Sequence, residues 1–434
     1  MIAVVGNALW AHRQSLASLT MRAAGVLAGF VVTVLIGRWF GPRANGQYAI
    51  VTQTAMFLSI VAVGGLDLAV VREFSRTQAA GKKLALSTFA RSLGQAIVLA
   101  LAIVVVLTLG GDRLLMLMGR DAVPANSLVV LCIILLARTM TRFLASMLRS
   151  QSRFVLAQAV EVLMIPLGTI TLVAVGFTHS VSGLLWATAV AGMAAAAIGI
   201  AASLRFVGRG PGTLSVASAT LLSTALPLWG VAVTQNLSDW YGLATVSAVT
   251  GIYDAGLYRV AAQFAMVFSL VSTGLFGTFA TQISAAFHAG DRERVARLAS
   301  SATRLSAVLM APVAAYFLLF APRVMGLIGP EFRAGAPLLQ VLVVGQVAIA
   351  LASPAGLVLA LTGHPRVNLA FTGISAALML LFAPMVAHAF GAVGIAAFVS
   401  AALVGQNIAA HFSVRRLEGI DALFGRVLMQ RGQP

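Results

Sequence analysis

The sequence has few charged residues. Only 9% of its 434 residues are charged, whereas 60% are hydrophobic, and the mean hydropathy is +0.97. A soluble domain carries roughly 25% charged residues, so this chain has too little polar surface to enclose a core of its size in water. The same composition excludes an intrinsically disordered chain. The chain must therefore sit in lipid.

Cysteine is almost absent, and histidine is scarce and scattered. The single cysteine, Cys132, excludes a disulfide framework and a cysteine-based metal site. His179, His288, His364 and His388 form no cluster in the sequence. We therefore expect no metal, no cofactor and no catalytic residues.

Long charge-free runs predict the number of membrane spans. A bilayer core about 30 Å thick needs roughly 20 apolar residues per helix, and these runs are too long for barrel strands. They predict an all-α, polytopic membrane protein with about twelve transmembrane helices. The predicted spans are residues 17–37, 46–71, 85–109, 124–148, 154–177, 182–204, 217–243, 255–284, 304–328, 335–361, 367–388 and 392–413. No cleavable signal peptide is expected, because the first apolar run is itself long enough to span.

Acidic residues are a minority, with 12 Asp and Glu against 29 Lys and Arg and a formal net charge of +17. The basic residues lie in short clusters between apolar runs, which favours a membrane surface over nucleic acid. With the N-terminus in the cytoplasm, 18 of the 29 fall on the cytoplasmic side and six on the outer side. This bias predicts that both termini are cytoplasmic.

The two halves of the chain repeat at an offset of 210 residues. Residues 41–48 align with residues 251–258, and nine of the 25 positions from 41 to 65 are identical to their counterparts. Six spans per copy predict a parallel repeat of two six-helix lobes, residues 1–208 and 209–434, joined by the glycine-rich segment 205–212. Two such lobes with a cavity between them suit alternating access. A duplication without transport is the alternative.

Several motifs resemble a known superfamily. They are residues 38–48, residues 65–72, residues 225–228 with Asp239, residues 251–259 and residues 290–294. In this order and spacing they resemble the multidrug, oligosaccharidyl-lipid and polysaccharide exporters, in the branch of the O-antigen and polysaccharide flippases. The similarity covers nearly the whole chain.

The resemblance implies a twelve-helix, two-lobed flippase of the bacterial inner membrane. Such proteins move an undecaprenyl-diphosphate-linked oligosaccharide between leaflets during lipopolysaccharide O-antigen or exopolysaccharide biosynthesis. The implied partners are this lipid-linked oligosaccharide, membrane lipids and other polysaccharide-assembly proteins, without nucleic acid, and the chain is expected to be a monomer.

Arginines within the spans are the candidates for binding a diphosphate. This anion cannot cross a dry bilayer core unless cations or water meet it, and the arginine fork binds phosphate oxygens in pairs. Arg138 lies near the middle of the fourth span, and Arg142 follows one turn later; a structural pair with Glu161 is the alternative. Arg22 and Arg259 are further candidates, with snorkelling to the headgroups as their alternative.

Acids and amides within the spans supply further candidates. Glu161 and Asp239 could carry a coupling proton, although structural pairing is the more common role. Gln53 and Gln263 occupy equivalent repeat positions and could hydrogen-bond a sugar, although bonding between helices is more common.

Two expectations concern the cytoplasmic side. Asp67, close to the end of the second span, is expected to pair with Arg72 or Arg91. Residues 288–304 predict an amphipathic helix on the inner leaflet, with a solvated loop as the alternative.

Three functions are compatible with these features. The first is the flippase. The second, a multidrug or cation antiporter of the same fold, needs acids in its cavity, whereas this chain has arginine near mid-span and three acids within the spans. The third, a membrane polysaccharide polymerase or ligase, needs a sizeable outer loop, and the outer loops here are short.

Overall fold

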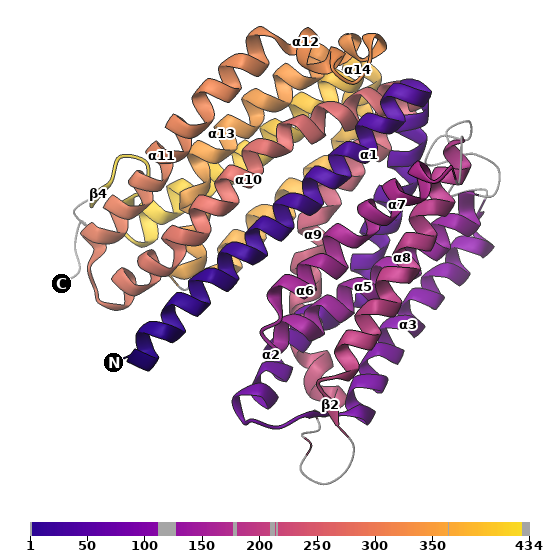
Figure 1. Cartoon of the computed structure of the whole chain (residues 1–434). Helices are drawn as coiled ribbons and strands as arrows, with labels where there is room; N and C mark the ends of the chain where they lie inside the picture. The colour runs from indigo at the N-terminus through magenta and orange to yellow at the C-terminus, as the bar shows by residue number, and fades with distance from the viewer. Residues whose placement is uncertain are drawn as a thin grey trace. The chain divides into compact units, whose positions relative to one another are not determined.

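The computed structural model describes residues 2–111, 127–176, 180–208, 213, 216–362 and 364–427. Helices dominate these residues (Figure 1). The first half contains α1 (Ile2–Val63), α2 (Leu66–Ala79), α3 (Leu86–Leu109), α5 (Ser127–Ser150), α6 (Phe154–Gln158), the π-helix η2 (Ala159–Leu163), α7 (Met164–Ala174) and α8 (Val181–Leu204). The second half contains α9 (Ser218–Val249), α10 (Ile252–His288), α11 (Arg292–Leu319), α12 (Ala321–Gly326), the 3-10 helix η3 (Pro330–Gly335), α13 (Ala336–Leu361) and α14 (Pro365–Leu417).

Two minimal sheets accompany the helices. Strand β1 (Leu84–Ala85) pairs in parallel with β2 (Val207–Gly208), and β3 (Ile420–Asp421) pairs antiparallel with β4 (Arg426–Val427). The first pairing ties the connection before α3 to the chain that follows α8.

Nine helical segments in the described residues are long and apolar enough to cross a membrane. Two of the nine are double spans, because a glycine with non-helical backbone divides each: Gly41 in α1 (φ 75°, ψ −173°) and Gly391 in α14 (φ 64°, ψ −158°). Helix α9, with 32 residues, is also of spanning length. The fold therefore supplies twelve such helices, and the predicted all-α polytopic class is confirmed.

The chain forms two compact units. Unit 1 comprises Met1–Phe40 and Gln47–Asn236, and unit 2 comprises Gly41–Gly46 and Leu237–Pro434. Helix α9 contributes to both: in unit 1 the indole Nε1 of Trp229 donates a hydrogen bond to the carbonyl of Val61 (3.1 Å). The predicted lobe boundary between residues 208 and 209 precedes α9. That the two lobes move against each other about this boundary stays a prediction.

The internal repeat is visible in the backbone itself. Gly41 and its counterpart Gly251 have closely similar dihedral angles, φ 75° with ψ −173° and φ 102° with ψ 169°. Such angles are accessible essentially only to glycine. In both copies a long helix continues directly after this glycine.

Repeat-equivalent segments also touch each other reciprocally within unit 2. A Cβ on Gly46 would overlap the carbonyl oxygen of Ile252, and a Cβ on Gly256 would overlap the carbonyl oxygen of Pro42. Pro42 corresponds to Ile252 and Gly46 to Gly256, so the contact has the local two-fold symmetry of a parallel repeat. The two backbones approach this closely only because neither glycine has a side chain.

Two predicted elements have other bounds in the structure. The second span ends at Val63 rather than at residue 71, because Gly64 and Gly65 take positive φ values of 60° and 74° and break the helix. Residues 292–304 are helical, as predicted, but they are the first part of the longer α11, and α10 ends at His288. A place for this segment on the inner leaflet stays a prediction. The linker residues 209–212 and the start of the fourth span, residues 124–126, lie outside the described residues.

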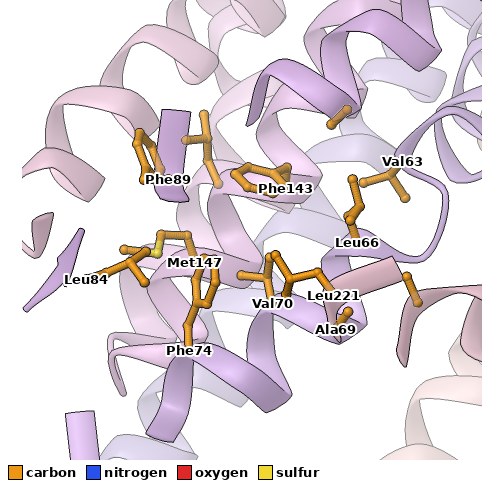
Figure 2. Close-up of a cluster of buried hydrophobic side chains, with 13 residues drawn as sticks. Val63, Leu66, Ala69, Val70, Phe74, Leu84, Phe89, Phe143, Met147 and Leu221 are labelled. Carbon is orange, nitrogen blue, oxygen red and sulfur yellow. The ribbon is translucent and has the colours of Figure 1, made fainter. Parts of the chain in front are cut away.

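An apolar core in unit 1 fixes α5 against its neighbours. Phe143 and Met147 of α5 pack with Phe74 of α2, Phe89 of α3 and Leu221 of α9 (Figure 2). The rings of Phe89 and Phe143 are 6.3 Å apart between centroids. Because lipid is as apolar as these side chains, close packing contacts hold the helices together.

We expect the Gly256→Ala variant to be destabilised, because its new Cβ needs space that the carbonyl of Pro42 occupies. Overpacking of this kind costs about 1–3 kcal/mol. Gly274→Ala in the same helix is the control, since nothing lies within 4 Å of its Cβ and alanine favours a helix over glycine. Thermal unfolding in detergent measures both, and equal Tm values would contradict the close approach.

Candidate functional site

Three arginines follow one face of α5. Arg138, Arg142 and Arg149 are spaced four and seven residues apart, which places them along a single stripe of the helix. The side chains of Arg142 and Arg149 are 23% and 26% exposed. Arg149 lies at the end of the fourth span and is one of the 18 basic residues that the charge bias assigns to the cytoplasmic side, but its spacing from Arg142 also places it on this stripe.

Arg138 binds the backbone of the π-helix. Its Nη1 donates to the carbonyl of Glu161 in η2 at 3.3 Å. A π-helix shifts the backbone hydrogen bonds from i→i+4 to i→i+5, and such segments are frequent at functional sites. A guanidinium has five N–H donors. Among the described residues, one of the five donors of Arg138 forms a hydrogen bond, the one to the Glu161 carbonyl.

Arg142 forms an ion pair with Asp67 at the start of α2. Its Nε lies 2.6 Å from Oδ2 of Asp67, which is 5% exposed, while Oδ1 accepts a hydrogen bond from the amide of Leu68 (3.0 Å). The expected pairing of Asp67 with Arg72 or Arg91 is thus wrong. Arg72 instead lies 3.8 Å from Glu73. The break at Gly64 and Gly65 is the reason, because it starts a new helix that carries Asp67 to α5.

Glu161 serves two arginines with different groups. Its carboxylate forms an ion pair with Arg149, while its backbone carbonyl accepts from Arg138. Arg138 and Glu161 are therefore in contact, as the structural alternative expects, but the contact is with the backbone carbonyl of Glu161 and not with its carboxylate. A coupling-proton role for Glu161 stays a prediction.

Arg22 of α1 stands beside this group. Its side chain is exposed, and its charge, like those of Arg142 and Asp67, acts electrostatically on Arg149. Helix α1 approaches η2 closely one turn later, where a Cβ on Gly25 would lie only 2.6 Å from Cγ1 of Val162.

The arginine cluster, as we call these residues, has a surplus of positive charge. It consists of Arg22, Arg138, Arg142 and Arg149 with the carboxylates of Asp67 and Glu161. Four cations against two anions leave an excess of two positive charges. Among the described residues, no group of three or more His, Cys, Asp and Glu side chains could hold a metal ion. The chemistry that this cluster offers is anion binding by guanidinium groups.

The remaining candidates are spread over both units. Gln53 lies half-buried on α1 in unit 1. In unit 2, Arg259 and the buried Gln263 lie on α10, and Asp239 lies on α9, where it interacts electrostatically with Arg259. Asp239 also acts on Tyr258, the repeat counterpart of Tyr48. Substrate or coupling roles for these residues stay predictions.

The described helices define a polytopic, all-α membrane protein. A family model described as polysaccharide biosynthesis protein matches residues 12–280, more than half of the chain. The chain belongs to this polysaccharide biosynthesis protein family, which confirms the resemblance found in its motifs. No curated protein matches the sequence.

Three solved structures show the same fold. An inward-facing multidrug resistance MATE family transporter of the MOP superfamily has a TM-score of 0.75 at 16% identity and covers 92% of this chain and 97% of its own. The lipid II flippase MurJ, in an inward closed conformation, has a TM-score of 0.70 at 14% identity and covers 93% and 87%. A MOP superfamily transporter from Pyrococcus furiosus, described as having a binding pocket of reverse polarity, has a TM-score of 0.58 at 15% identity and covers 92% and 91%.

Replacing Arg142 by alanine is expected to lower the free energy of unfolding by up to about 3–5 kcal/mol, because it leaves the buried Asp67 carboxylate without its cation. Adding Asp67→Asn should restore part of the loss. Arg297→Ala is the control, since Arg297 and Glu293 form an exposed pair worth under about 1 kcal/mol. Chemical unfolding of the wild type and these three variants would contradict the pairing if Arg142→Ala and Arg297→Ala lost equal stability.

Proposed function

We propose that this protein is a flippase for a lipid-linked oligosaccharide carried on undecaprenyl diphosphate, in the assembly of a cell-surface polysaccharide such as O-antigen or exopolysaccharide. It works as a monomer in the bacterial inner membrane with both termini cytoplasmic. The lobes of residues 1–208 and 209–434 expose the site alternately to each side. The observation that carries this proposal is the arginine cluster of unit 1.

The charge of the cluster suits a diphosphate. A diphosphate esterified at both ends carries two negative charges, and the cluster has an excess of two positive ones. An uncompensated anion in hydrocarbon is costly, whereas several guanidinium forks can bind its oxygens in pairs. Arg138 contributes most directly, because only one of its donors has a partner in the described structure.

Asp67 and Glu161 act as exchangeable partners in this proposal. Without substrate, their carboxylates hold Arg142 and Arg149. Phosphate oxygens compete for the same guanidinium groups, so substrate binding loosens both ion pairs. The Glu161 carboxylate then becomes able to take up a proton, which supports its candidacy for coupling.

The comparisons support a transported substrate of this class. The family model describes polysaccharide biosynthesis proteins, and the structural neighbour MurJ is described as a lipid II flippase. MurJ is named as a flippase of lipid II. For the present protein, this structural likeness supports a lipid-linked sugar as the class of substrate.

We expect Arg138→Gln to reduce translocation about tenfold or more, because one lost charge-assisted contact is worth roughly 1.5–3 kcal/mol. Proteoliposomes with a fluorescent undecaprenyl-diphosphate oligosaccharide report the rate at which it reaches the opposite leaflet. Arg138→Lys should recover part of the rate, since it keeps the charge without the fork. The exposed Arg297→Gln variant is the control. Unchanged translocation by Arg138→Gln would remove Arg138 from the mechanism, and a covalently altered product would indicate a polymerase.

Export of organic cations is the second candidate function. Asp239 is an exposed acid within a spanning helix of unit 2, and a MATE family transporter shares the fold. Because the arginine cluster repels cations, we expect proteoliposomes to show no efflux of a lipophilic cation such as tetraphenylphosphonium. Cation efflux that Asp239→Asn abolishes, without translocation of the lipid-linked sugar, would favour the exporter.

A further inference from the structure

Unit 1 contains a pocket near the start of α6 and the end of α8. Its volume is about 650 Å³, within the range of ligand pockets. The walls are apolar side chains from α1, α6 and α8 and the residues after α8, namely Met21, Phe154, Val155, Ala202 and Phe206. None of the four arginines of the cluster lines it.

The rim of this pocket is basic. Arg153 and Arg205 both line it, and both side chains are exposed. The Cζ of Arg153 lies over the ring of Phe206, 5.6 Å from its centroid. No acidic side chain is among the residues that line the pocket.

An apolar interior with a cationic rim fits an amphipathic anion. Inorganic phosphate gains nothing from walls of Phe, Val, Met and Ala, whereas an acyl chain does. A phosphate group would find two arginines at the depth where α6 begins and α8 ends, near the ends of two spanning segments. Basic pockets between transmembrane helices bind the headgroups of anionic lipids.

We propose that this pocket binds an anionic phospholipid of the surrounding leaflet. One acyl chain lies between α1, α6 and α8, and the headgroup phosphate lies between Arg153 and Arg205. The site is separate from the transported substrate, and it does not depend on the flippase proposal.

Photocrosslinking tests this site on the full-length protein. We would reconstitute the chain in phosphatidylcholine vesicles containing phosphatidylglycerol with a diazirine on one acyl chain, and map the crosslinks by mass spectrometry. Crosslinks are expected at Phe154, Val155 or Ala202. Each arginine near an anionic lipid is worth about 1 kcal/mol, or roughly fivefold in affinity, so Arg153→Gln and Arg205→Gln should each reduce the yield about fivefold.

Two further variants make the result specific. Arg72→Gln removes an exposed arginine from α2 of the same unit and should leave the yield unchanged. Ala202→Leu keeps every charge but fills the pocket, and should abolish the crosslinks. Thermal unfolding of each variant shows that it is folded.

Three outcomes would overturn the proposal. The first is equal crosslinking by a zwitterionic phosphatidylcholine probe that neither arginine variant reduces. The second is loss of the crosslinks on addition of inorganic phosphate. The third is capture of a photoreactive undecaprenyl diphosphate in place of phosphatidylglycerol, which would assign the pocket to the substrate's tail. Because the readout is binding, a failure here leaves the translocation experiments untouched.

Discussion

The ion pair between Arg142 and Asp67 is the interaction on which the candidate site depends. A charged side chain within a membrane-embedded bundle needs a partner or water. Carboxylates that could be such partners are few in this chain, which has 12 acidic residues for 29 basic ones. Asp67 secures α2 to α5, and Glu161 secures η2 to the same helix. These two acids suffice to hold the arginine stripe in place but not to neutralise it. The net positive charge of the arginine cluster follows from that deficit.

The scaffold is symmetric, whereas its charge is not. Gly41 and Gly251 share a backbone conformation, and the reciprocal contacts of Gly46 and Gly256 join equivalent segments. The arginine stripe of α5 has no such counterpart. At the repeat offset, Arg138, Arg142 and Arg149 correspond to Ala348, Ala352 and Leu359 of α13. The repeat thus accounts for the shared backbone features, whereas the arginine stripe belongs to one copy only.

The sequence predicted the elements that depend on composition and local spacing. Apolar runs predicted the spanning helices, and the repeat predicted equivalent glycines, whose dihedral angles agree. The four-residue spacing of Arg138 and Arg142 predicted a shared face. These features need no knowledge of tertiary contacts, because helix geometry alone converts spacing into position.

Features that depend on contacts between helices could not be predicted from local spacing. Asp67 pairs with Arg142, 75 residues away, because the Gly64–Gly65 break gives α2 a new direction. The π-helix of residues 159–163 has no sequence signature, yet its Glu161 carbonyl positions Arg138. Arg149 was placed at the membrane surface because it ends a span, although its carboxylate partner comes from the following span.

The two basic sites of unit 1 differ in what holds their arginines. In the arginine cluster, carboxylates occupy Arg142 and Arg149, so an anion that binds these two arginines competes with Asp67 and Glu161, and the same carboxylates can displace it again. At the apolar pocket, Arg153 stacks on Phe206, and no acid lines the site. An anion there meets no internal competitor and gains an apolar wall as well. A transported substrate must bind and then be released, whereas a structural lipid must stay bound. Under the two proposals, unit 1 keeps a lipid at the apolar pocket and releases a cargo of the same charge from the arginine cluster, because only the cluster contains competing carboxylates.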